Sequence, residues 1–508
     1  RRRMKRLRQR LRPANYQNLR PGKKSCFKMR REKDFIGEIE LGDNVLYGIH
    51  SVRAHENFPD DTPFHIEWYK AMALTKRACY LTAGEFFSKA SQKYDLGKMH
   101  IRVISSEYLA ALEESALECE EGKHFEHFIV PAVSGSAGTS INMNVNEILA
   151  NRALQKLEHK PGEYAILDPI EDANIFQSTN DVVPTALRVA IMQLLLVLEK
   201  SVNDLRAETE VLEKKYRNTL RIGYTQMQEA VPSTFGRLFS SYSDALSRDW
   251  WRVSKCLERI KVINLGGTAI GTSIAVPKYF VTEVVAKLQQ LSSLPVTRGE
   301  NLSDATSNLD PFVEVHGILK AHAVNLEKIV SDIRLLASDV HGVHSLSIPK
   351  KQVGSSIMPG KVNPVIPEYV ISCAHRVYSN DQLITHLAAQ GCLELNPYIP
   401  VIGHAMLESL KLLISADNSA AKNLLHNILI DDSTAEAEVI SSPSVTTALL
   451  PFIGYKKSAE MAACMRNSGI TVFEANKILG YMKEEKLKEI LKPENLVQGG
   501  YRLQDLED

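Results

Sequence analysis

The feature that most constrains this chain is the length of its uninterrupted helical segments. From Thr185 to Ile222 there is neither Gly nor Pro, and apolar residues recur at steps of three and four. Similar segments run from Leu319 to Val340, after Pro367, and from His404 to Ile430. Long apolar stripes are stable only when they pack against one another. The sequence therefore predicts a mainly α protein with a central antiparallel bundle, whose remaining apolar surface favours assembly between subunits.

Charge is distributed unevenly along the 508 residues. Residues 1–31 hold 14 of the 61 basic side chains and no acid, so the rest carries 47 basic against 60 acidic side chains. An acidic body argues against nucleic acid as a partner of the folded part. The basic arm is either an anion-binding segment, an organellar presequence or upstream sequence; Met29, a natural start, favours the last.

The domain organisation follows from these patterns. We expect a basic, disordered arm over residues 1–33 and an N-terminal domain of short segments over residues 34–177. The long helices place the bundle domain at residues 178–433, and Pro- and Gly-punctuated sequence places a small C-terminal domain at residues 434–508.

Cysteine usage and hydropathy bear on location. The seven cysteines are scattered without a C-x-x-C pair, which is typical of reduced thiols in a cytoplasmic protein. By inspection of the sequence, no apolar run approaches the roughly 18 residues needed to cross a bilayer. The sequence therefore predicts neither secretion nor a membrane partner.

One loop, GSSIMPGKVNP at residues 354–364, superficially resembles a phosphate-binding loop. Five residues rather than four separate its glycines, and Val362 stands where a magnesium-binding hydroxyl is needed. Pro359 removes a backbone donor from the cradle. A nucleotide site is therefore rejected.

Three other stretches are equally rich in hydroxyl and amide side chains. They are SGSAGTSINMN at residues 134–144, QSTND at residues 177–181 and GYTQMQEAVPS at residues 223–233. Each alone is usually a turn or a helix cap. Together with the lysine of the first loop, such neutral donors suit the binding of carboxylates.

In this order, the four segments resemble the fumarase/aspartase superfamily of lyases, and within it the aspartate ammonia-lyases. GSSIMPGKVNP matches the superfamily signature, and GTSINMNVNEILAN, QSTND and INLGGTAIGT match other blocks. The resemblance extends from about Asp34 into the C-terminal domain. It implies a three-domain, mainly helical homotetramer with active sites shared between three subunits, and no cofactor or metal.

The resemblance also implies residue roles in the reversible elimination of ammonia from L-aspartate, which gives fumarate through an aci-carboxylate. Ser355 in the loop is the implied base. The implied contacts to the reacting carboxylate are Thr139, Ser178, Thr179 and Ser356. The implied contacts to the other carboxylate are Thr225, Lys361 and Asn363, and those to the leaving group are Asn180 and Gln226.

Alternatives remain open at this point. Fumarases have a histidine where this chain has Gln226, and TQCE where it has VIPE at residues 365–368, which favours the ammonia-lyase over a fumarate hydratase. Tyr224 replaces the usual arginine and Ser136 a usual glycine. These departures leave room for another substrate, or for a catalytically silent relative.

Two further motifs carry other hypotheses. HFEH (His124 to His127) and HGVH (His341 to His344) lack the i,i+4 spacing of a helical zinc pair, so we expect surface histidines rather than a metal site. The glycines of INLGGTAIG, residues 263–271, do not fit G-x-G-x-x-G, and we expect a turn without a βαβ unit around it.

Overall fold

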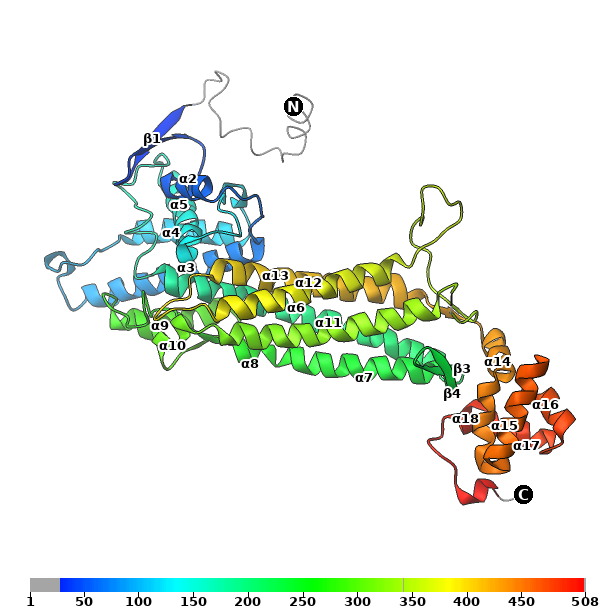
Figure 1. Ribbon diagram of the computed structural model, residues 1–508. Coiled ribbons are helices and arrows are strands. Elements are labelled where there is room, and N and C mark those ends of the chain that lie inside the picture. Colours follow the sequence, from blue (N-terminus) through cyan, green and yellow to red (C-terminus); the bar gives the residue numbers. More distant parts are fainter. Residues whose placement is uncertain (1–27, 341, 507–508) are drawn as a thin grey trace.

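The computed structural model describes residues 28–340 and 342–506, and in this part the chain is mainly helical. Figure 1 shows an elongated helix bundle with the N-terminal elements at one end and the C-terminal elements at the other. Residues 1–27 of the expected basic arm, and His341, lie outside the described residues.

The bundle consists of five long helices whose apolar faces form one continuous core. Helix α6 packs against α7 and α13, and α12 packs between α11 and α13. This arrangement confirms the predicted bundle. The bounds are Thr179–Lys215 for α6, Phe235–Ser254 for α7, Asp310–Leu336 for α11, Val365–Ala388 for α12 and Ile399–Ser419 for α13.

Two of the predicted helices end well before the expected residue, and α11 ends at Leu336 rather than at Val340. The segment expected to stay helical to Ile222 leaves the helix at Lys215 and continues as strand β3, Leu220–Thr225, paired with β4, Gln228–Thr234. The side chains of Leu220 and Ile222, two positions apart, both pack into a second apolar cluster, so the period of two typical of a strand replaces the helical period.

The helix expected to reach Ile430 also ends early, at Ser419. A π-helical turn at Ala420–Leu424 and a 3₁₀ turn at Leu425–Asn427 follow. The chain then forms β8, Leu429–Ile430, which pairs with β7, Leu346–Ser347. This pairing joins the segment before the GSSIMPGKVNP loop to the bundle.

The N-terminal region contains more long helix than the sequence suggested. Helix α3 has 26 residues, many of them fully buried, and it packs against α4, α6 and α9. The elements are β1 Met29–Lys33, β2 Glu38–Gly42, α2 Ile49–Asn57, α3 Ile66–Ser91, α4 Ser106–Glu120 and α5 Thr139–Lys156, with 3₁₀ turns at Leu96–Lys98, Phe125–His127 and Ser136–Gly138.

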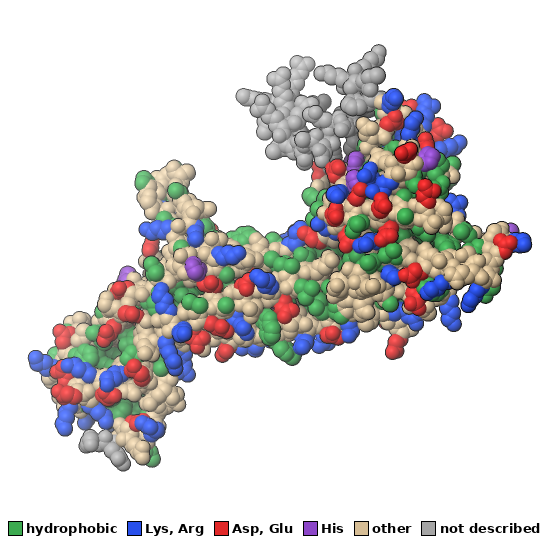
Figure 2. Space-filling model, turned by 180° about the vertical axis from the view of Figure 1, so that it is seen from behind, with side chains coloured by type: hydrophobic (Ala, Val, Ile, Leu, Met, Phe, Trp, Pro, Cys, Tyr) green, Lys and Arg blue, Asp and Glu red, His purple; other side chains and the backbone are tan. Residues whose placement is uncertain are grey.

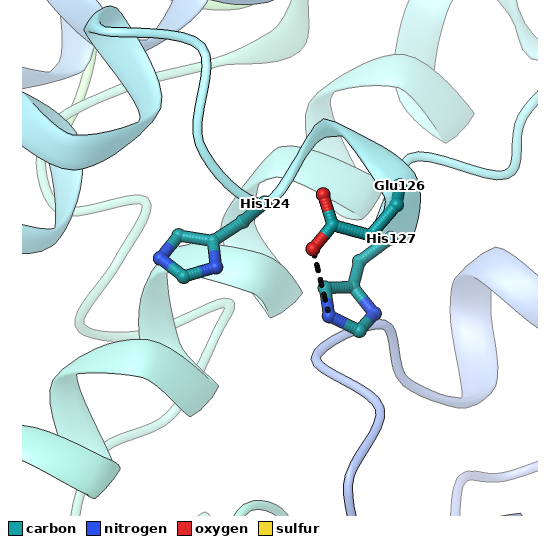
Figure 3. A group of neighbouring side chains, drawn as sticks. All are labelled: His124, Glu126 and His127. Atoms are coloured by element: carbon teal, nitrogen blue, oxygen red, sulfur yellow. Dashed lines mark ion pairs between the residues drawn. The ribbon is translucent and has the colours of Figure 1, made fainter.

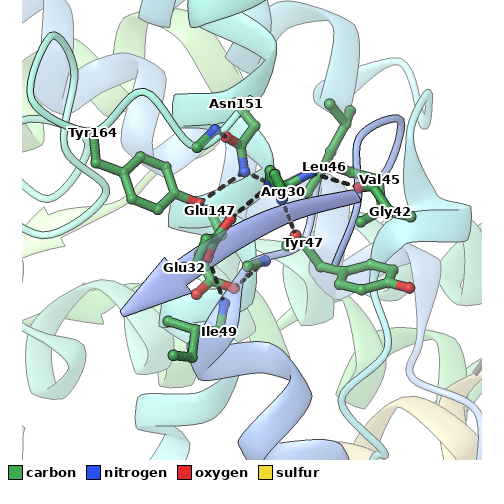
Figure 4. A network of polar contacts seen from close by, with 12 residues as sticks. Arg30, Glu32, Gly42, Val45, Leu46, Tyr47, Ile49, Glu147, Asn151 and Tyr164 are labelled. Atoms are coloured by element: carbon green, nitrogen blue, oxygen red, sulfur yellow. Dashed lines mark hydrogen bonds and ion pairs between the residues drawn. The ribbon is translucent and has the colours of Figure 1, made fainter. Parts of the chain in front are cut away.

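The β1–β2 hairpin is fixed by a buried polar network (Figure 4). Arg30 donates to Glu32 and to the carbonyl of Tyr47, each at 2.8 Å. Glu32 accepts the first backbone N–H of α2, from Ile49, at 2.8 Å, and Glu147 of α5 accepts the neighbouring Gly48 N–H at 2.7 Å. Residues 29–33, part of the arm predicted to be disordered, therefore form an ordered strand, because a buried Arg–Glu pair needs a fixed backbone.

Two short parallel strands flank helix α9, Lys278–Ser292, in the sequence. Strand β5, Val262–Ile263, pairs in parallel with β6, Thr297–Arg298, and α10, Leu302–Ser307, follows. The expectation of no βαβ unit near residues 263–271 is thus wrong. Strands of two residues carry too little sequence pattern to be recognised.

The C-terminal elements have a small apolar core of their own, to which β3 also contributes. The elements are α14 Asp432–Ser441, a 3₁₀ helix at Pro443–Leu449, α15 Leu450–Ser468, α16 Val472–Leu479, α17 Glu484–Ile490, α18 Pro493–Leu496 and a 3₁₀ turn at Leu503–Leu506. The boundaries of the three domains stay predictions.

Two helical stretches, Thr179–Lys215 and Ile399–Asn427, are long and apolar enough to cross a membrane by length and composition. This corrects the expectation that no segment approaches that length. In the most apolar 18-residue window of each stretch, 78% and 61% of the window, respectively, is buried inside the protein, and that burial accounts for the apolar composition.

The six described cysteines are free, and Cys26 lies outside the described residues.

Candidate active site

Helix α6 begins with the QSTND segment, and its cap explains the residues there. Ser178 is the N-cap: its Oγ accepts the Asn180 N–H at 3.3 Å, while Asp181 accepts the Ser178 N–H at 2.9 Å. The second oxygen of Asp181 accepts the N–H groups of Gly266 and Thr268. Burial raises the pKa of Asp181 to about 6. The buried carboxyl thus fixes the helix start to the GGTAIGT loop.

The start of helix α5 lies beside this cap. Gly138, at φ +88°, turns the chain into Thr139, and a Cβ placed on Gly138 would lie 3.6 Å from the methyl carbon of Thr179. Asn142, one turn along α5, donates to Thr179 Oγ1 at 3.3 Å. Four predicted site residues therefore come together here: Thr139, Ser178, Thr179 and Asn180.

A solvent-open hollow faces this cluster. Thr179 and Asn180 line it together with side chains that the sequence analysis did not single out, namely Ala137, Pro184, Thr306, Leu309, Leu395, Asn396 and Ile399. The signal for Asn396 is its position in LELNPYIP, three residues before α13 begins, where its Oδ1 accepts the Tyr398 N–H at 2.9 Å. The hollow places a few polar groups in an apolar wall, the usual composition of a small-molecule site.

The GSSIMPGKVNP loop holds Ser355 in a specific environment. Ser355 Oγ accepts the backbone N–H groups of Ile357 at 3.2 Å and Met358 at 3.0 Å. Two donors aimed at one hydroxyl oxygen lower the free-energy cost of ionising it. Ser355 is half-buried, whereas Ser356 beside it is exposed.

The two ends of this loop are tied together. Gly354 N–H donates to the Lys361 carbonyl and Asn363 Nδ2 donates to the Gly354 carbonyl, both at 2.9 Å. A Cβ on Gly354 would lie 2.8 Å from backbone atoms of both partners, so glycine is required for this closure. The Lys361 side chain is exposed, and Gly360 adopts φ +81°. The loop is therefore a closed ring that presents Ser355, Ser356 and Lys361 together.

The remaining predicted residues lie in the turn between β3 and β4. Thr225 pairs with Gln228, so Gln226 and Met227 form a two-residue turn with φ values of 51° and 60°. Such turns favour Asn or Gly, and other residues there adopt strained backbone. Thr225 and Gln226 are exposed. Strain at an exposed turn is typical of a functional site.

The two departures from the superfamily pattern have local contacts. Ser136, at φ 63°, accepts the Ser140 N–H at 3.1 Å and so caps the start of α5 in place of a glycine turn. The Tyr224 ring lies 6.0 Å from the guanidinium carbon of Arg221, so a positive charge is retained close to position 224.

The predicted residues form two groups at opposite ends of α6 within one chain. With 37 residues, α6 is about 55 Å long. Tyr216, just after α6, accepts the Ile430 N–H at 3.2 Å, and Ile430 pairs with Leu346. The eight steps along the backbone from Ser347 to Ser355 reach at most about 29 Å, too little to span α6 back to Thr179. Figure 1 shows this loop projecting at the end of the bundle where β3 and β4 lie. The Thr139–Asn180 group is therefore separate from the Ser355 loop.

The HFEH segment brings three potential metal ligands closer together than its spacing suggested. The ligand atoms of His124, Glu126 and His127 lie within 4.8 Å of one another (Figure 3). However, Nδ1 of His127 accepts the Leu46 N–H at 3.4 Å, so the neutral ring carries its proton on Nε2, the nitrogen 3.8 Å from Glu126. His124 Nε2 lies 2.9 Å from Glu118. These contacts describe a hydrogen-bonded surface cluster, and we assign no metal to it.

Comparison with known proteins identifies the families to which this chain is similar. The family described as "Lyase" matches residues 45–379, and the family described as "Fumarase C C-terminus" matches residues 445–498. Aspartate ammonia-lyase of Bacillus subtilis (strain 168) is 35% identical over 473 residues, which cover 93% of this chain and 96% of that protein. The enzyme of the same name from Escherichia coli (strain K12) is 35% identical and covered to 97%.

Solved structures agree with this placement. Fumarate lyase:delta crystallin from Brucella melitensis, bound to cobalt, superposes with a TM-score of 0.85 at 34% identity, over 93% of this chain and 100% of that one. Class II fumarase from Schistosoma mansoni gives a TM-score of 0.81 at 26% identity over the same shares. The chain therefore belongs to the fumarase/aspartase superfamily of lyases. Within it, the curated relatives named above are aspartate ammonia-lyases.

Proposed function

We propose that this protein is an aspartate ammonia-lyase that converts L-aspartate reversibly to fumarate and ammonia. The names and coverage of its relatives support this activity. The structural observation that carries the chemistry is the Ser355 hydroxyl, whose oxygen accepts two backbone N–H groups. A serine acts as a base only when its alkoxide is stabilised, and these donors and the cationic Lys361 of the same loop supply that stabilisation.

The reaction can be written with these residues in defined roles. The Ser355 alkoxide takes a proton from the carbon next to the β-carboxylate, and that carboxylate becomes a doubly negative aci-carboxylate. Collapse of this charge forms the carbon–carbon double bond and expels the ammonium group as neutral ammonia. Donors aimed at the aci-carboxylate contribute most to the rate. We assign this role to Thr139, Ser178, Thr179 and Ser356.

The other carboxylate and the leaving group require separate contacts. We assign Thr225, Lys361 and Asn363 to the first and Asn180 and Gln226 to the second. Gln226 cannot accept a proton, which suits the departure of neutral ammonia and disfavours hydration of fumarate. The exposed positions of Thr225, Gln226 and Lys361 leave them available to a substrate.

We further propose a homotetramer in which three subunits build each site. The separation of the two residue groups along α6 supports shared sites. Hydrophobic side chains at the bundle surface support burial against other subunits (Figure 2). Those more than about one-third exposed include Leu196, Val197, Val211, Trp251, Val324 and Leu383. Free thiols support a cytoplasmic location.

The test is the rise in ultraviolet absorbance as fumarate forms, measured in parallel with L-aspartate and L-malate. Fumarate from L-aspartate alone is the expected result. Fumarate from L-malate alone would identify a fumarate hydratase, and no product from either would indicate another substrate or a silent relative. Ser355→Ala is expected to lower turnover at least about 10³-fold with unchanged circular dichroism, and a rate near that of the wild type would remove Ser355 from the role of base.

A further inference from the structure

Lys76 is a fully buried lysine in the middle of helix α3. Its Nζ donates to Gln177 Oε1 at 2.8 Å and lies 3.5 Å from Asn174 Oδ1. Both acceptors are neutral amides. In the described part of the chain no carboxylate pairs with Nζ. A buried ammonium without an ion pair is costly, and a neutral side chain of similar length would fill the same volume.

Two routes connect this ammonium to the candidate active site. Gln177 directly precedes Ser178 and Thr179, so its side chain fixes the start of the carboxylate-binding segment from the core side. Asn174 Oδ1 also accepts Asn142 Nδ2 at 3.0 Å, and the same amide nitrogen donates to Thr179 Oγ1 at 3.3 Å. The lysine is therefore linked to the Thr139–Asn180 group, on its core side, through hydrogen-bonded amide side chains.

We propose that Lys76 is a positioning residue that holds the Gln177–Asn180 segment and places a buried positive charge behind the reacting carboxylate. The inference rests on the proposed ammonia-lyase activity. In that reaction the negative charge on this carboxylate increases on the way to the aci-carboxylate. A fixed positive charge in a dry environment therefore stabilises the transition state more than the bound substrate.

The surroundings of Lys76 give the charge a pH dependence. Burial lowers the pKa of Lys76 to about 7, and Asp181 on α6 and Cys79 on α3 are the titratable groups that oppose this. Asp181 is engaged by three backbone N–H groups and belongs to the helix cap. The positive charge behind the site is thus present below about pH 7 and lost above it. Turnover is expected to fall as Lys76 loses its proton.

The test uses Lys76→Met and Lys76→Gln, with Lys89→Met as a matched control. Lys89 is an exposed lysine on the same helix, whose Nζ donates to the Tyr279 hydroxyl at 2.7 Å. We expect both Lys76 variants to lower kcat at pH 6.5 by at least about tenfold, with KM changed less than about threefold. They should also lose the fall in kcat near pH 7, while the control keeps it.

Binding provides a readout besides turnover. The nitronate of 3-nitropropionate carries the charge distribution of the aci-carboxylate, whereas succinate carries that of a ground-state dicarboxylate. The Lys76 variants should bind the nitronate at least about tenfold more weakly and succinate nearly as well as the wild type, measured by calorimetry.

Several results would overturn the proposal. An equal loss of affinity for both ligands, or a wild-type pH profile of kcat in a folded Lys76 variant, would show that Lys76 serves only in packing. If Lys76→Met does not fold, Lys76→Gln decides, because it keeps a donor toward Gln177. Wild-type enzyme that makes no fumarate from L-aspartate would instead refute the proposed function, and that assay is done first.

Discussion

The separation of Thr179 from Ser355 makes subunit complementation a direct test of the shared site. Thr179→Ala and Ser355→Ala each remove one group that the proposed mechanism requires at every site, so each variant alone is expected to be inactive. If one subunit supplies Thr179 and a different subunit supplies Ser355, a mixed oligomer contains some sites with both groups intact. If a single subunit supplied both, no mixture would contain an intact site.

The expected recovery of activity follows from random association of the two variants. In an equal and random mixture, the subunit that supplies Ser355 is the Thr179→Ala chain in half of the sites. Independently, the subunit that supplies Thr179 is the Ser355→Ala chain in half of them. The mixture should therefore regain about one quarter of the wild-type activity per site. A third subunit does not alter this fraction, because neither variant changes the residues it supplies.

The experiment dissociates the two purified variants together in mild denaturant, reassociates them and follows fumarate formation from L-aspartate. The control mixes Ser355→Ala with the Thr179→Ala/Ser355→Ala double variant, which exposes the subunits to the same treatment but provides no intact Ser355. Mixtures of the single variants that stay inactive, while wild-type enzyme survives the same treatment, would refute the assignment of the two residues to different subunits.

Two predictions concern the bundle itself. Gly403→Ala places a Cβ 2.4 Å from the Trp68 ring, and the overpacking should lower the free energy of unfolding by about 1–3 kcal/mol in urea titrations; an unchanged midpoint would show that the ring moves freely. His322 lies between the buried carboxylates of Asp249 and Asp417, at 3.0 and 2.9 Å, and despite burial they raise its pKa to about 10. His322→Leu leaves the buried carboxylate of Asp417 without a cation and Asp249 with Arg252 alone, at 3.1 Å, and should cost about 3–5 kcal/mol of stability. Because the folded pKa lies above the unfolded value of about 6.5, this contribution is complete below pH 6.5 and lost as the pH approaches 10, so the difference between variant and wild type should shrink over that window.

The long helices could be predicted from the sequence because a period of 3.6 repeated over many turns has few alternatives. Their ends could not be predicted as well. The residues after Lys215 are as free of Gly and Pro as those before it, and only packing of Leu220 and Ile222 into the C-terminal core selects a strand there. Short elements such as β5 and β6 depend on tertiary contacts alone.

Lys76 shows what a motif-based interpretation of the site omits. A single lysine within the apolar stretch AMALTKRACYLTAG is a local signal that a sequence can offer. Its partners Asn174 and Gln177 are about a hundred positions away in the chain, so only the fold shows that the charge lies behind Thr179. The motifs predict which side chains face the substrate, whereas the residues that support those side chains from the core can be found only in the folded structure.

The length of α6 separates the predicted site residues into two groups that are held in different ways. The Thr139–Asn180 group is held by caps, buried amides and Asp181, whereas the Ser355 loop and the Gln226 turn are exposed and held mainly by their own backbones. In the proposed mechanism, the group that stabilises developing charge is best kept preorganised, whereas the loop that carries the proposed base has to admit the substrate and exclude water. Placing the two groups at opposite ends of a 37-residue helix lets each keep its own stability. If the site is shared as proposed, Ser355 meets its substrate only when subunits associate, so dilution that dissociates the oligomer should abolish turnover while the helices remain folded.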